Sequence, residues 1–136
     1  MARTCPSHHR PAVPPVRRPE QALAAIRHAT DCGRTPCVAV GALTTERLPI
    51  GLIVVDGATT PDVPAVLEVV LEGLSGAAAS LFTASSGPGA TIPGATLFTA
   101  VEGQCRAADV AFLDWFVRVG RFWTAVGELR GREAGW

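Results

Sequence analysis

The fold of this chain is decided by the stretch Ala77-Ala-Ala-Ser-Leu-Phe-Thr-Ala-Ser-Ser-Gly-Pro-Gly-Ala-Thr-Ile-Pro-Gly94. Its first half predicts a short buried strand over 78–84, and its second half a Gly- and Pro-rich loop that leads into a helix. In α/β proteins a ligand commonly binds just past the carboxyl end of such a strand. We therefore expect any ligand to contact the strand end and the loop, at Thr83, Ser85, Ser86, Gly87 and Gly89.

The same region carries no side chain suited to acid–base or metal chemistry. Positions 77–101 contain no His, Cys, Asp, Glu, Lys or Arg. Backbone amides of the 85–89 loop could hold an anion at the start of a helix. The loop matches neither a P-loop nor a dinucleotide-binding fingerprint, and the chain has no Lys. The pattern favours a binding module over an enzyme.

The residues before this stretch predict two helices and a hairpin. A helix covers 19–30, and two strands over 36–43 and 48–56 lie close enough to pair as a hairpin. The second strand is an unbroken apolar run, which predicts burial on both faces. The next helix follows Thr60, whose hydroxyl can cap it. Its apolar residues repeat at helical spacing, at Val63, Val66, Leu67, Val70, Leu71 and Leu74.

The residues after the central stretch predict a helix over 94–109, a strand over 110–117, a Gly turn and a return strand over 121–126. The whole order gives an α/β fold with α+β character, in which helices pack on a mixed β-sheet. A length of 136 residues fits one domain. We expect a disordered Pro- and Arg-rich tail over 1–18, a single domain over 19–131 and a frayed end over 132–136.

The charge distribution limits the partners. Net charge is zero, but positions 1–19 hold four Arg and no acid, so nucleic acid could be contacted only through this tail. No apolar run is long enough to span a membrane, and the Pro-rich start does not match a secretory signal. Four Cys without such a signal indicate reduced thiols in a cytoplasm.

Two groups of residues are possible metal ligands. Cys5, His8 and His9 lie in the tail, without a second folded pair of ligands. His28, Cys32 and Cys37 lie near the first helix, with Cys105 as the only obvious fourth partner. Zinc sites typically combine two tight ligand pairs, which neither group offers. We expect no metal and no cofactor, and we expect Cys105 to be a buried, inert thiol.

The last hairpin carries the remaining candidates. Asp114 stands alone in an apolar strand, and either backbone amides at a turn or Arg118 or Arg121 could be its partner. Four aromatic side chains cluster nearby, and core packing is the first explanation for them. If exposed together, they would form an interaction surface for a protein partner or a second copy. These four are Trp115, Phe116, Phe122 and Trp123.

From about 36 to 131 the chain resembles a JAB/MPN domain, specifically of the RadC type. Ser86-Gly87 stands where that family has Ser-Gly, and Leu113-Asp114-Trp115 stands where it has Leu-Asp-His. Arg121-Phe122 stands where it has Arg-Tyr. The first two motifs align with no gap between them.

The resemblance implies a degenerate site. The two zinc-binding His of the family fall on Phe82 and Ala84, the zinc-binding Asp on Ala95 and a nearby Ser on Ile92. The catalytic Glu falls near Leu52. None of these side chains ligates zinc or transfers a proton. The resemblance therefore implies a JAB-like domain that acts without catalysis, as a protein-interaction or regulatory module and often as a dimer.

Two alternatives stay open. One is a domain that binds a small molecule or anion with the 85–89 loop. The other is a hydrolase that uses Ser85 or Ser86. It would need a His base, and the chain offers only His8, His9 and His28, all far back in the sequence.

Overall fold

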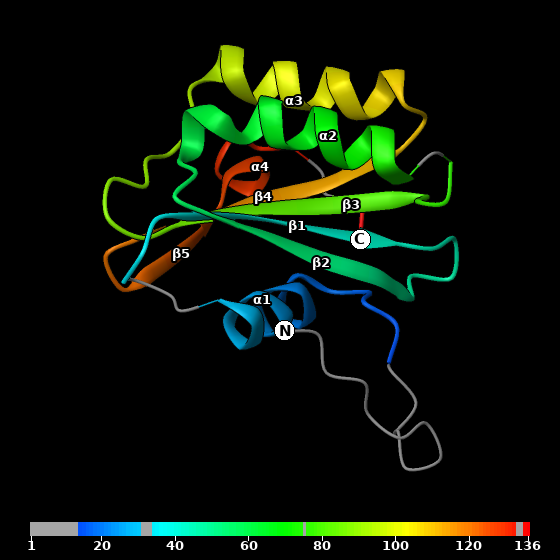
Figure 1. Cartoon of the computed structure of the whole chain (residues 1–136), viewed down its shortest axis with the longest axis horizontal. Helices are drawn as coiled ribbons and strands as arrows, with labels where there is room; N and C mark the ends of the chain where they lie inside the picture. The colour runs from blue at the N-terminus through cyan, green and yellow to red at the C-terminus, as the bar shows by residue number, and fades with distance from the viewer. Residues whose placement is uncertain (1–13, 31–33, 75, 133–134) are drawn as a thin grey trace.

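The computed structural model describes residues 14–30, 34–74, 76–132 and 135–136 (Figure 1). Five strands and five helical segments lie in these residues. In chain order they are α1 (Pro19–Ala29), β1 (Cys37–Leu43), β2 (Pro49–Asp56), the short 3-10 helix η2 (Thr60–Asp62), α2 (Val63–Leu74), β3 (Ser80–Ser86), α3 (Ala95–Ala107), β4 (Ala111–Val119), β5 (Phe122–Ala125) and α4 (Val126–Leu129).

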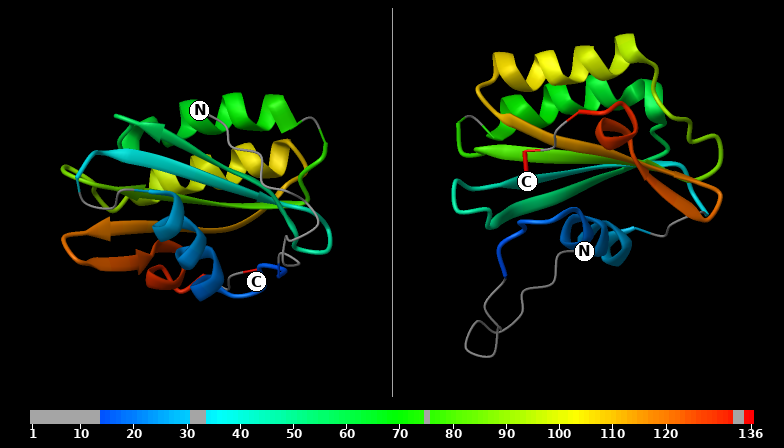
Figure 2. Two further views of the ribbon diagram at one scale, coloured as in Figure 1. Left: turned by 60° about the horizontal axis from the view of Figure 1, so that its bottom comes forward. Right: turned by 180° about the vertical axis from the view of Figure 1, so that it is seen from behind.

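The described strands form one mixed sheet in the order β2-β1-β3-β4-β5. Only β3 and β4 pair in parallel, and the other neighbours are antiparallel. Helices α2 and α3 cover one face, and α1 covers the other (Figures 1 and 2). The expected class, a mixed β-sheet with helices packed on it, is confirmed, as are the β1–β2 hairpin and the central place of β3.

Each face of the sheet has its own apolar core. Under α2 and α3 the sheet contributes Val38, Leu81 and Trp115, and the helices add Leu67, Phe98 and Val101. Under α1 it contributes Ala39, Phe82 and Phe116, and the helix adds Ala22 and Ile26. The helical spacing of the α2 sequence brings Val63, Leu67 and Val70 into the core. The residue before η2 is Thr59, not Thr60, and Asp62 Oδ2 accepts hydrogen bonds from the Thr59 amide at 2.8 Å and from the Thr59 hydroxyl at 3.0 Å.

Strand β2 differs from expectation. Its apolar run predicted burial on both faces, yet every one of its residues is exposed or half-buried. The reason is its place at the edge of the sheet, where β1 is the one strand of the described residues that pairs with it. An unbroken apolar run is typical of a central strand, so the exposed apolar edge of β2 is unusual for a solvated surface.

Strand β4 contains an irregularity that sets the orientation of its side chains. Leu81 of β3 is opposite Phe112, and Thr83 is opposite Trp115. Two residues of β4, Leu113 and Asp114, therefore lie opposite the single residue Phe82, which is a β-bulge. Because of this extra residue, Phe112 and Trp115 both enter the core under α2 and α3.

Both ends of the described chain pack against the domain. Val16 is 7% exposed and its amide donates to the Arg47 carbonyl at 2.8 Å, so the folded part begins before position 19. At the other end, Arg132 donates to the Leu113 carbonyl and the Trp136 ring lies 6.0 Å from that of Phe116, although 132–136 was expected to be frayed. The rest of the expected tail, 1–13, and positions 133–134 lie outside the described residues. No helix in the described ranges has the length and apolar character needed to cross a membrane.

Candidate functional site

The hydroxyl groups at the end of β3 are bonded inside the protein. Thr83 Oγ1 donates to the Ala39 carbonyl at 2.9 Å. Ser85 Oγ accepts a hydrogen bond from Trp115 Nε1 at 2.9 Å, and Ser86 Oγ lies 3.1 Å from Cys37 Sγ. All three side chains are buried. Contact of these three side chains with a ligand stays a prediction, and their hydroxyls already have partners inside the protein.

The loop after β3 is more accessible. Gly87 has φ +97°, and a Cβ there would lie 2.4 Å from the Thr35 carbonyl oxygen, so only glycine fits this conformation and this close approach. Gly89 is exposed. Both glycines line a cleft of about 280 Å³ that Arg118 and Gly120 complete from the β4–β5 turn. The loop glycines therefore keep their place among the candidate binding residues.

Apolar side chains occupy the positions to which the resemblance assigns the zinc His and the catalytic Glu. Gly41 of β1 is paired with Phe82 on one side and Leu52 on the other. A Cβ on Gly41 would lie 2.2 Å from the Phe82 ring, so the ring lies directly over this glycine. Phe82 also contacts the rings of Phe116 and Trp136, with centroids 6.4 and 6.1 Å away. Leu52 and Ala84 belong to the same apolar core under α1.

The other two assigned positions lie apart from this core. Ala95 begins α3, which covers the opposite face, and it is exposed. Ile92 is 42% exposed, next to Thr91, whose carbonyl accepts a hydrogen bond from Thr60 Oγ1 at 2.7 Å. The structure thus brings Leu52, Phe82 and Ala84 together, and it leaves Ala95 and Ile92 outside that cluster.

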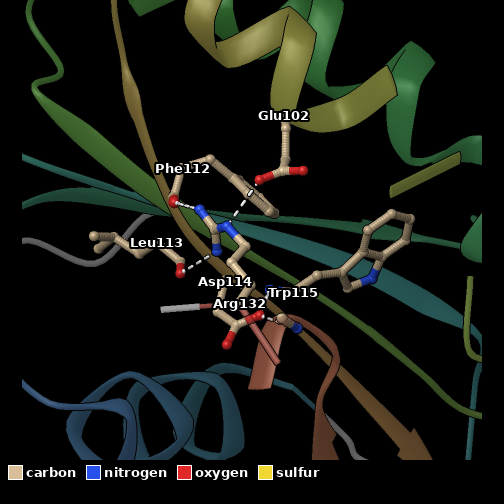
Figure 3. A network of polar contacts seen from close by, with 7 residues as sticks. Glu102, Phe112, Leu113, Asp114, Trp115 and Arg132 are labelled. Carbon is tan, nitrogen blue, oxygen red and sulfur yellow. Dashed lines mark hydrogen bonds and ion pairs between the residues drawn. The ribbon is translucent and has the colours of Figure 1, made fainter. Parts of the chain in front are cut away.

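Asp114 is held by backbone amides. Its Oδ1 accepts hydrogen bonds from the amides of Trp115 at 2.7 Å and Gly127 at 2.8 Å (Figure 3). Of the expected alternatives, bonding to backbone donors is confirmed. Burial raises the pKa of the Asp114 carboxyl above its ordinary value of 3.8, and the two amides and Arg132 offset part of this effect. The carboxylate fixes the bulge of β4 to the start of α4, which indicates a structural role.

The raised pKa of Asp114 makes the free energy of unfolding depend on pH. Because its pKa is raised on folding, the folded protein keeps this proton at a higher pH than the unfolded chain does. The contribution of Asp114 to the free energy of unfolding is therefore greatest below pH 3.8. It falls as the pH rises through the raised pKa of the folded protein. In urea titrations, the free energy of unfolding of the wild type minus that of Asp114→Asn should decrease as the pH rises above 3.8. Asn keeps an acceptor oxygen but does not titrate, so a difference that stays constant or increases with pH would contradict this assignment.

The four aromatic residues of the last hairpin do not form one surface. Trp115 and Phe116 are fully buried, so the expectation of an exposed surface is wrong for these two. Phe122 is 78% exposed and Trp123 is partly buried. Trp115 and Phe116 are consecutive strand residues, so they point into the two cores, one on each face of the sheet. Phe122 and Trp123 remain candidates for contact with a partner.

The described candidates for metal binding do not assemble. Cys105 lies in the core under α3, where burial and the nearby Glu102 raise the pKa of its thiol to about 12. Cys37 is buried beside Ser86, and His28 is exposed on α1. No group of three or more potential ligands occurs among the described residues. Cys5, His8, His9 and Cys32 lie outside them.

Two surface features were not predicted from the sequence. The first, which we call the apolar groove, has a volume of about 530 Å³ between β2 and α2. Its exposed large apolar side chains are Val69 at 71% and Ile53 at 42%. The groove is lined by Ile53, Val55, Ala65, Val66, Val69, Val70, Gly73 and Leu74. The helical spacing of the sequence did not include Val69 in the core-facing side of α2. The groove is accessible because β2 lies at the edge of the sheet.

The second feature, which we call the basic cleft, has a volume of about 410 Å³ and is lined by Arg27, Thr30, Arg118, Arg121 and Trp123. These residues come from the end of α1 and from the β4–β5 hairpin. Because more than 80 positions separate the two segments in the sequence, no local pattern could have revealed the cleft.

Comparison with protein-family models found no family that matches this chain, and comparison with curated proteins found no significant match.

Proposed function

We propose that this chain is a non-catalytic JAB/MPN-like domain of the RadC type that acts in the cytoplasm as a protein-interaction module. The order of its helices and strands agrees with the order on which the resemblance rests. Leu52 and Phe82, assigned to the catalytic Glu and a zinc His, lie on one face around Gly41. Their apolar side chains support a domain without the hydrolase chemistry. The buried Cys105 thiol fits a reducing compartment.

The observation that carries the interaction role is the open edge of β2 beside the apolar groove. Positions 49–55 contain no charged residue. Proteins generally protect edge strands with charges, prolines or bulges, because an open edge pairs readily with another strand. Here Pro49 and a bulge at Ala42/Leu43 protect one end, and Asp56 lies at the other, so positions 50–55 between them carry no such protection. The remaining edge offers both unpaired backbone groups and exposed apolar side chains.

A second copy of this chain is the partner that fits this edge. Two β2 strands can pair antiparallel across a twofold axis, which joins the two sheets into one. An axis perpendicular to the sheet keeps both α2 helices on the same side. The two apolar grooves then lie next to each other, and Val69 and Ile53 of each copy are removed from water. This arrangement is self-complementary, as a twofold interface requires.

Sedimentation equilibrium tests this proposal. We expect the wild type to be a dimer with a dissociation constant in the micromolar range. Val69→Lys should raise this constant by about tenfold or more, because it places two charges in the interface. Leu129→Lys is the matched control, since Leu129 is also an exposed helical aliphatic residue (63% exposed) but lies on α4, outside the groove.

Two results would contradict the proposal. A wild type that stays monomeric up to about 0.5 mM would exclude a functional dimer. Equal weakening by Val69→Lys and Leu129→Lys would show that the effect does not depend on the groove. The same purified protein should contain no stoichiometric zinc, and zinc at one equivalent would contradict the non-catalytic part of the proposal.

A further inference from the structure

The basic cleft gathers positive charge without a visible counter-charge. Arg27 comes from the last turn of α1, Arg118 from the end of β4 and Arg121 from the turn that follows. No acidic residue lines the cleft in the part of the chain that the structure describes. Guanidinium groups stay charged at every physiological pH. Three of them in one cleft repel each other unless an anion binds between them.

Arg118 is the residue that most clearly lacks a partner. Its Nη1 atom is buried and has no hydrogen-bond partner among the described residues. A buried N–H of a charged group is costly to leave unpaired, although the rest of the Arg118 side chain is only half-buried. A water molecule could satisfy the N–H but would not neutralise the charge. The arrangement therefore calls for an anionic acceptor.

The surroundings of Arg118 extend the site toward the loop after β3. Arg118 lines both the basic cleft and the cleft that contains Gly87, Pro88 and Gly89. A ligand anchored on Arg118 can therefore reach the glycine loop on one side and Trp123 on the other. The indole of Trp123 is partly buried and offers a flat apolar surface. The volume of the basic cleft, about 410 Å³, lies within the range of small-molecule sites.

We propose that the basic cleft binds the phosphate group of a small molecule, with Arg118 as the central ligand and Arg27 and Arg121 beside it. The planar fork of arginine matches the geometry of phosphate oxygens better than that of any other side chain. The proposal does not depend on self-association, because the apolar groove is lined by other elements, β2 and α2. A nucleic acid is the less suitable ligand, since three arginines in one cleft do not make the extended basic surface that a backbone needs.

Isothermal titration with inorganic pyrophosphate, at constant ionic strength and with the full chain, tests the site. We expect saturable binding with a dissociation constant below about 1 mM. Arg118→Met and Arg121→Met should each weaken binding by about tenfold or more. Arg121 is exposed, so its variant keeps the test valid if Arg118→Met does not fold. Arg121→Lys, which keeps the charge but loses the fork, should bind with intermediate strength.

Arg106→Met is the matched control. Arg106 is also an exposed arginine, but it lies at the end of α3 and lines a different cleft. Its variant should bind pyrophosphate as the wild type does. Three outcomes would overturn the proposal. These are the absence of binding up to about 10 mM, an equal loss in Arg106→Met, and tight binding of a single-stranded oligonucleotide by a protein that does not bind pyrophosphate.

Discussion

Replacement of Trp115 by alanine should lower the free energy of unfolding by about 4 kcal/mol, among the largest effects of any single substitution in this chain. The side chain is fully buried between the sheet and α3 and stacks on Phe98 with ring centroids 6.4 Å apart. Its Nε1 donates to Ser85 Oγ at 2.9 Å, so the substitution also removes a buried hydrogen bond. Urea titration followed by circular dichroism measures the effect.

Two further variants separate packing from the general effect of losing an aromatic ring. Phe122→Ala removes a ring from the same hairpin, but Phe122 is 78% exposed, so we expect a change within about 0.5 kcal/mol. Trp115→Phe keeps most of the volume and loses only the indole donor, so its effect should fall between the other two. Similar losses for Trp115→Ala and Phe122→Ala would contradict the division of the hairpin aromatics into core and surface.

Replacement of Arg132 by methionine should destabilise the fold by about 3 kcal/mol. Arg132 donates to the carbonyls of Phe112 at 2.5 Å and Leu113 at 3.1 Å, and its Nε lies 2.8 Å from Glu102 Oε2 (Figure 3). Strand β5 pairs only with positions 116–119 of β4. Arg132 therefore supplies donors to the part of β4 that β5 does not reach. Its guanidinium also lies 5.4 Å from the centre of the Phe112 ring.

Arg130→Met is the control for this substitution. Arg130 is exposed, and within the described residues its side chain makes one hydrogen bond, to the Pro93 carbonyl at 3.0 Å, and lies 5.9 Å from the centre of the Phe98 ring, so its loss should cost about 1 kcal/mol or less. Glu102→Gln should give an intermediate loss that becomes smaller at high salt, because the ion pair is only partly buried. An Arg132→Met variant as stable as the wild type would contradict this prediction. It would instead favour a frayed chain end, as the sequence alone suggested.

The most reliable predictions from the sequence were those that depend on local periodicity. The spacing of Val63, Leu67 and Val70 was sufficient to orient α2, because a helix brings residues three and four apart onto one face. The composition of the 77–94 stretch was sufficient to place a strand and a loop there. The lack of ionisable residues over 77–101 is visible in the sequence without any structure. The proposal of a non-catalytic domain still rests on it.

Only the tertiary structure decided which strand lies at the edge, which side chains face solvent and where charges meet. The apolar run of β2 is compatible with a central strand, and its exposure follows from a strand order that no local pattern encodes. Ser85 and Ser86 became interior groups because helices cover both faces of β3, and the bulge at Asp114 brought Phe112 and Trp115 into the same core. The basic cleft joins Arg27 to Arg118 across most of the chain. Sequence patterns report neighbours within a few residues, whereas these features depend on pairings between distant segments, and so they exist only once the sheet has formed.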